Sequence, residues 1–113
     1  MNITSQLNAL ITGLGLPVET GKFSGKAPDE YVVVTPLADT FALHCDNRPE
    51  YETQEARLSL YCKKNYQATK RRLAKALLDA GFTITLRQHL GREDDTGYFH
   101  HVTDVAITFK WED

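Results

Sequence analysis

Signals of catalysis, membrane insertion and disulfide bonding are scarce in this chain. It carries no nucleophile-elbow motif, no Walker loop and no pair of carboxylates spaced for acid–base chemistry. Its longest apolar runs fall well short of the roughly 20 residues that a membrane helix requires. These absences argue against an enzyme and against a membrane-spanning protein.

Cysteine is also scarce, with two residues. If residues 47–50 form a hairpin turn, Cys62 lies about ten residues further along its strand than the position opposite Cys45. That separation far exceeds the limit of about 7 Å between the Cα atoms of a disulfide. We expect two free thiols, buried or nearly so. Residues 1–10 lack the features of a signal peptide, so we also expect the protein to remain in a reducing cytoplasm.

What the chain does contain fits one small folded unit. Its 113 residues are 42% hydrophobic and 25% charged, which is ordinary for a folded protein. A chain of this length has too little interior for two separate cores. We therefore predict a single domain over residues 1–113.

Apolar periodicity predicts two helices. The first covers Asn2–Gly13, with Asn2 as cap and Gly13 or Gly15 at its end. The second covers Asn65–Ala80, where one apolar stripe leaves the basic side chains outside it. Gly81 stops this second helix.

The remaining segments alternate or carry β-branched residues and predict strands. Tyr31–Thr35 is apolar on both faces, so we place it in the middle of a sheet, stopped by Pro36. In the last strand the alternation changes phase near Thr103, which indicates a bulge or a segment buried on both faces. Val18–Gly25 is expected to form either a weak edge strand or an extended arm. Four further strands are expected, at Thr40–Cys45, Tyr51–Cys62, Phe82–Leu90 and Tyr98–Trp111. The predicted class is α+β, a mainly antiparallel sheet with two helices packed on it, and we expect both helices to share one face of the sheet.

Charge is divided unevenly along the chain, although the net charge is only −2. Seven of the thirteen basic residues lie between Ala56 and Leu78, a stretch without any acidic residue. Complementary patches of this kind steer encounter and fix register between copies. The candidate interface residues are therefore Lys70, Arg71, Arg72 and Lys75 on the positive side, and Glu50, Glu52, Glu93, Asp94 and Asp95 on the negative side. The alternative is that both sets are simply solvated.

Histidine and cysteine are the obvious candidates for a metal site, but their spacing is unfavourable. Neighbours in a strand point to opposite faces, so neither His44 with Cys45 nor His100 with His101 forms a chelating pair. A cross-strand pair of His89 and His101 on diagonal positions stays open. We expect no metal and no cofactor.

Nucleic-acid binding by the basic helix 65–80 is the stronger alternative function. Its cationic side chains have the chemistry to contact phosphates. The chain as a whole is slightly acidic, however, and Tyr61 and Tyr66 form no evident stacking platform.

The order of these elements resembles the small tail-terminator and head–tail joining proteins of long-tailed bacteriophages. The likeness lies in the central strand at Tyr31–Val34 followed by Ala38-Asp39, the Asp46-Asn47 turn, and the strand Ala56–Cys62 that leads into an amphipathic helix. It also lies in the junction Leu77–Phe82 and in the segment Asp95–His100 that enters a long final strand.

The resemblance implies a non-enzymatic structural protein that forms a ring, usually six-fold, on the last ring of the tail tube. Such a ring stops tube growth and presents a surface to the head connector. The implied partners are further copies of the chain, the tail-tube protein and the head connector protein, with nucleic acid only as the passing genome. The implied location is the virion neck or tail top, after assembly in the host cytoplasm. Another neck or tail-tube subunit of the same assembly is the nearest alternative.

Overall fold

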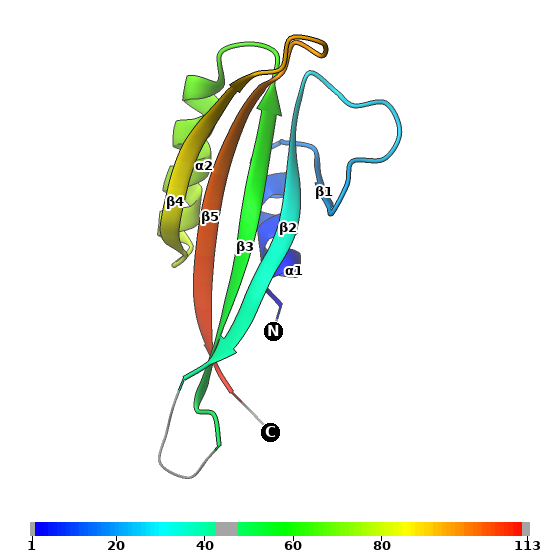
Figure 1. Cartoon of the computed structure of the whole chain (residues 1–113). Coiled ribbons are helices and arrows are strands. Elements are labelled where there is room, and N and C mark those ends of the chain that lie inside the picture. Colours follow the sequence, from blue (N-terminus) through cyan, green and yellow to red (C-terminus); the bar gives the residue numbers. More distant parts are fainter. Residues whose placement is uncertain (1, 43–47, 112–113) are drawn as a thin grey trace.

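Two helices and five strands make up the part of the chain described by the computed structural model, residues 2–42 and 48–111. In order they are α1 (Ile3–Gly13), β1 (Val18–Thr20), β2 (Glu30–Phe41), β3 (Tyr51–Cys62), α2 (Tyr66–Asp79), β4 (Thr83–Arg92) and β5 (Phe99–Lys110) (Figure 1). The predicted α+β class is confirmed.

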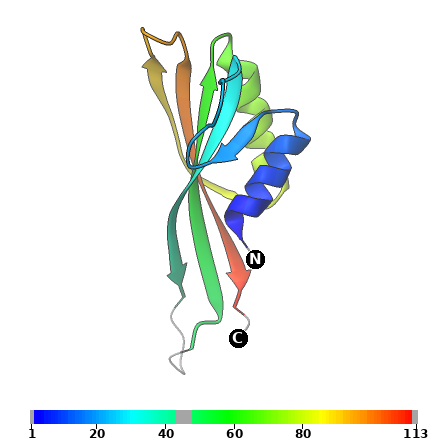
Figure 2. The same cartoon turned by 90° about the vertical axis from the view of Figure 1, so that its right-hand side faces the viewer.

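The five strands form one sheet in the order β1-β2-β3-β5-β4. All neighbouring strands are antiparallel except β1 and β2, which pair in parallel over three residues. Both helices pack on the same face of the sheet, as Figure 2 shows, so the expected shared face is confirmed. On the opposite face, here called the open face, no helix lies in the part of the chain that the structure describes.

Each helix begins at an asparagine whose side chain accepts backbone N–H groups of the first turn. Asn2 accepts from Thr4 and Ser5, and Asn65 accepts from Gln67. These bonds satisfy donors that a helix start otherwise leaves unpaired.

Each helix also ends in the same way, with a glycine in the left-handed region. Gly15 follows α1 with φ of 82° and Gly81 follows α2 with φ of 91°. In both cases the next residue, Leu16 or Phe82, donates its N–H back into the last turn and buries its side chain. This is the Schellman arrangement, which needs a residue tolerant of positive φ.

The hydrophobic core lies between the helices and the upper part of the sheet. The apolar faces of the predicted strands and of the second predicted helix give eight expected core residues. Six of them are essentially inaccessible to solvent, namely Val32, Val34, Leu58, Leu60, Leu73 and Leu77. Ile107 is partly buried against this core. Phe109 is buried too, but further down β5 and outside the core cluster.

Strand β2 is longer than the sequence predicted, and the expectation that Pro36 stops it is wrong. The strand continues to Phe41, with a register shift between Pro36 and Ala38. Because β1 pairs only with Val32–Val34, β2 is an interior strand there and an edge strand from Pro36 onward. An edge tolerates a proline because the missing N–H is not needed on the unpaired side.

The separate strand expected at Thr40–Cys45 is likewise wrong in its start, because Thr40 and Phe41 belong to β2. Its later residues, His44, Cys45 and the turn residues Asp46 and Asn47, lie outside the described residues. The expectation that Cys45 and Cys62 are too far apart to form a disulfide therefore stays a prediction.

The phase change in the last strand comes from burial on both faces. The register between β3 and β5 runs without interruption, so that ladder contains no bulge. Residues 101–105 of β5 are all buried. Register shifts occur in β4 instead, between Ile84 and Leu86 and between His89 and Gly91.

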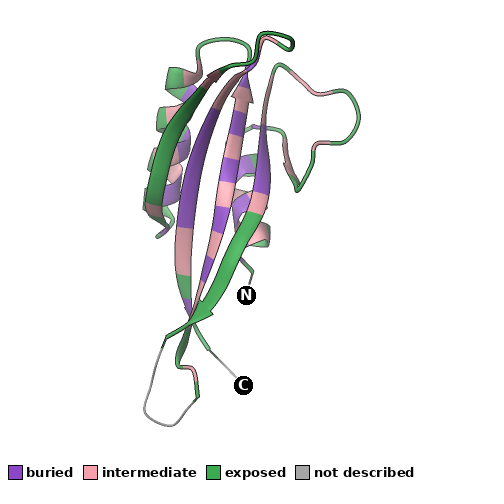
Figure 3. Cartoon of the chain, viewed as in Figure 1, coloured by how far each residue is buried: buried purple, intermediate pink, exposed green. Residues whose placement is uncertain are grey.

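The molecule is elongated, with extents of 53 × 26 × 24 Å. The lower parts of β2, β3 and β5 continue past the helices, as Figures 1 and 3 show. Residues 38–41, 50–54 and 107–111 make up this projection, which we call the strand extension. Its β2 portion is exposed to solvent.

Candidate assembly surfaces

Two of the four cationic side chains expected on the helix interface are engaged within the chain. Arg72 donates to the backbone carbonyl of Leu14 at 2.6 Å, which ties α2 to the end of α1. Lys75 pairs with Asp79 one turn later at 2.8 Å, and this bond raises the pKa of the lysine. An exposed pair of this kind contributes little to stability.

The other two differ in exposure. Lys70 is half-buried, with its ammonium 5.5 Å from the centre of the Tyr66 ring. Arg71 is exposed on the outward face of α2. Leu78, two turns further along that face, is 59% exposed. We call Arg71, Lys75 and Leu78 the outer helix face.

The acidic residues Glu93, Asp94 and Asp95 lie in the turn between β4 and β5, at the end of the molecule opposite the strand extension (Figure 1). The Glu93 carboxylate accepts a hydrogen bond from the Thr96 hydroxyl. Two backbone bonds close the turn, because the Glu93 N–H donates to the Tyr98 carbonyl and the Gly97 N–H donates to the Glu93 carbonyl. All three acidic side chains are exposed.

Glu50 and Glu52 lie in the strand extension. Glu52 sits in register between Phe41 on β2 and Phe109 on β5, so these three share one face. It is the helix-bearing face, because Gln54, two residues on, accepts the Ile3 N–H at the start of α1. Trp111 packs edge-on against Phe41, with ring centroids 4.9 Å apart.

We call Phe41, Phe109, Trp111 and Glu52 the aromatic shelf. Phe109 is buried, whereas Phe41 is 55% exposed and Trp111 is 36% exposed. The helices end above it, and no other described element lies over it. The sequence predicted Glu52 as an interface residue but missed the aromatic side chains around it.

The predicted interface residues thus occupy three separate places within one chain: helix α2, the strand extension and the β4–β5 turn. Among the described residues, no predicted basic interface residue forms an ion pair with a predicted acidic one. Contacts between these sets would have to form between molecules.

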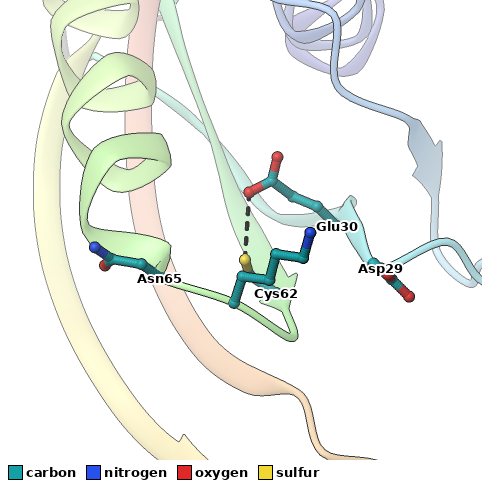
Figure 4. Close-up of a pocket in the computed structure, with 5 residues that line it drawn as sticks. Asp29, Glu30, Cys62 and Asn65 are labelled. Carbon is teal, nitrogen blue, oxygen red and sulfur yellow. Dashed lines mark hydrogen bonds between the residues drawn. The ribbon is translucent and has the colours of Figure 1, made fainter.

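A cavity of about 320 Å³ opens where α2 meets the ends of β2 and β3 (Figure 4). Inside it the Glu30 carboxylate accepts hydrogen bonds from the Thr69 hydroxyl at 2.6 Å and from the Cys62 thiol at 3.3 Å. Asp29 points away from this group. The three bonded side chains come from three elements and hold the start of α2 against the sheet.

The Cys62 thiol in this cavity is not activated as a nucleophile. Burial raises the pKa of the Cys62 thiol, and the adjacent Glu30 carboxylate raises it further. A thiol held protonated is a poor nucleophile. Cys62 is a buried free cysteine, as the sequence predicted.

His89 and His101 are directly opposite each other in the ladder, not diagonal as expected. Tyr66 of α2 stacks on His89 with ring centroids 4.7 Å apart, and His101 lies buried beneath α2. Within residues 2–42 and 48–111, neither ring nitrogen of His101 has a hydrogen-bond partner. Burial, together with nearby Lys70, Arg87, His89 and His100, lowers the pKa of His101 to about 4.

The open face contains two features that the sequence did not reveal. Arg57 and Asp104, paired across β3 and β5, form a two-pronged ion pair with distances of 2.8 and 3.0 Å. Above it Tyr31, Tyr61 and His100 stack in succession across three strands. Alternation along β3 places Arg57 and Tyr61 on the face opposite Leu58 and Leu60, but their partners depend on the register of β3 with β2 and β5.

No group of three or more potential ligands that could hold a metal ion occurs among residues 2–42 and 48–111. Within the same residues, neither helix has the length and apolar character needed to cross a membrane.

No protein-family model matches the chain, and no curated protein matches it.

Proposed function

We propose that this protein is a non-enzymatic structural subunit that forms a homo-oligomeric ring, in the manner of a tail terminator joining a phage tail tube to the head connector. The residues and element order that resemble that family support the proposal. Another neck or tail-tube subunit of the same assembly would act through the same kind of surfaces.

The observation that carries the proposal is the strand extension. An isolated small protein gains nothing from holding Phe41 and Trp111 in solvent beyond its core, because each exposed aromatic surface forgoes burial. In an assembly the same side chains become buried against a neighbour. Large exposed apolar patches rimmed by polar residues mark interaction sites.

The separation of charge supports the same function. A closed ring needs a heterologous contact, in which one patch of each subunit meets a different patch of the next. Basic side chains on α2 and acidic side chains at both ends of the molecule supply different patches within one chain. Complementary charge then selects the head-to-tail register.

The alternative of nucleic-acid binding by α2 is less well supported. Arg72 and Lys75, two of the four cations it depends on, are engaged by Leu14 and Asp79. Affinity of a true binder for DNA falls steeply with salt because bound counterions are released. We expect this chain to show no DNA binding with that steep dependence on salt concentration.

Native mass tests the proposal. We expect sedimentation velocity to show a monomer at low concentration and a discrete closed oligomer at high concentration or on addition of tail-tube protein. Negative-stain images of the larger species should show rings. A chain that stays monomeric at all concentrations, with and without tail tubes, would contradict the proposal.

A further inference from the structure

The aromatic shelf carries two exposed aromatic rings, Phe41 and Trp111, which pack against each other outside the core cluster. Phe41 and Trp111 lie on the helix-bearing face, past the start of α1, and Glu52 lies between Phe41 and the buried Phe109. Further acidic side chains at Asp39 and Glu50 are exposed beside them. The neighbouring cation Lys110 pairs with Tyr51 and by alternation points to the open face. Within residues 38–41, 50–54 and 107–111, the charged side chains on the shelf's face are therefore acidic, and we call Asp39, Glu50 and Glu52 the acidic rim.

A surface that complements this shelf is apolar at one point and basic around it. The outer helix face has that composition, because Leu78 is 59% exposed and Arg71 lies two turns before it on the same side of α2. Lys75 lies between them but is bonded to Asp79, so Arg71 is the cation available to a partner. The β4–β5 turn offers carboxylates without the shelf's paired aromatic rings.

We propose that the aromatic shelf of one copy receives the outer helix face of a second copy, with Leu78 against Phe41 and Trp111, and Arg71 against the acidic rim. This inference rests on the proposed ring and assigns the pair of surfaces that forms it. The contact is heterologous, because shelf and helix face are different surfaces of one chain. In an open assembly, each end subunit keeps one unused surface. Further copies therefore add until the two end surfaces meet and the ring closes.

Two variants remove one surface each without touching the core. Phe41→Gln removes the shelf and Leu78→Gln removes the apolar part of the helix face, and both positions are more than half exposed. Leu90→Gln is the matched control, because Leu90 is 51% exposed on β4 and belongs to neither surface. Circular dichroism and thermal unfolding establish that all three remain folded.

We expect sedimentation velocity to show that each of the first two variants raises the dissociation constant by about tenfold or more, as for a central interface residue. Leu90→Gln should associate like the wild type. An equimolar mixture of Phe41→Gln and Leu78→Gln has one intact contact per mixed pair. It should therefore recover heterodimers near the wild-type concentration, but no larger species.

Other outcomes overturn the inference. If both variants assemble like the wild type, the contact lies elsewhere, while the proposed ring function stands. If Phe41→Gln alone fails and mixing does not restore a dimer, the shelf pairs with another shelf or with a different protein. If the wild type never self-associates, the inference and the ring function fail together.

Discussion

Leu77 and Leu78 are neighbours in α2 with opposite surroundings. Leu77 is fully buried in the core and Leu78 is 59% exposed. We expect Leu77→Ala to lower the free energy of unfolding by about 2–5 kcal/mol, because it leaves a cavity that the packed core only partly refills. Leu78→Ala deletes the same side-chain atoms at a position where they are exposed to solvent, so it should change the free energy of unfolding by less than about 0.5 kcal/mol.

Urea unfolding of the two variants measures this difference. A loss of less than about 1 kcal/mol for Leu77→Ala would mean that the apolar stripe of α2 does not form the core.

His101 should make stability depend on pH. Its pKa is about 4 in the fold, against about 6.5 in the unfolded chain, so the unfolded state binds more protons between those values. The contribution of His101 to the free energy of unfolding is thus fully present above about pH 6.5. It is lost progressively as the pH falls to 4, because the unfolded chain takes up the proton more readily. The shift corresponds to a loss of at most about 3 kcal/mol.

Chemical denaturation at several pH values between 8 and 4 measures this loss. His101→Leu has no titrating ring under α2, so its stability should fall less over the same range. Equal pH dependence in the variant and the wild type would assign the effect to other groups.

At the scale of elements, α1 and α2 are joined by one side chain as well as by the core. Arg72 donates to the Leu14 carbonyl just past the end of α1, whereas Arg71 points outward. We expect Arg72→Ala to lower the free energy of unfolding by about 1 kcal/mol, because a hydrogen bond between the helices is lost. Arg71→Ala should leave stability unchanged and weaken self-association.

The two arginines therefore separate folding from assembly. Thermal unfolding reports the effect of Arg72→Ala, and sedimentation reports that of Arg71→Ala. A destabilised Arg71→Ala variant would place Arg71 in the fold instead of the interface.

At the scale of the whole molecule, the proposed contact combines an apolar part with a charged part that respond differently to salt. Raising the salt concentration from 0.1 M to 1 M shortens the screening length from about 10 Å to about 3 Å. We expect self-association to weaken but persist, since an exposed ion pair contributes at most about 1 kcal/mol. In Arg71→Glu the contact carries like charges, so added salt should strengthen association.

Sedimentation at both salt concentrations measures the two responses. A salt effect of the same sign in the wild type and in Arg71→Glu would remove Arg71 from the contact.

Most of the candidate assembly residues were named from charge alone, and the sequence could go no further. It selected Arg71 and Glu52, which the proposed contact uses, and also Arg72, which is bonded within the chain to Leu14, 58 residues away. The aromatic shelf was missed because Phe41, Phe109 and Trp111 come from segments far apart in sequence. A weak signal existed in the apolar residues that continue past the expected strand end at Pro36.

Local pattern determined the two helices, their asparagine caps, the alternation of β3 and nearly all of the core, because each depends on residues a few positions apart. Tertiary structure decided the rest. The shortness of β1 lets β2 run past Pro36, and the neighbours of β5 bury residues 101–105 on both faces. The strands β2, β3 and β5 extend beyond the helices because of the relative lengths of elements that meet only in the fold. This strand extension carries the aromatic shelf on which the proposed assembly depends.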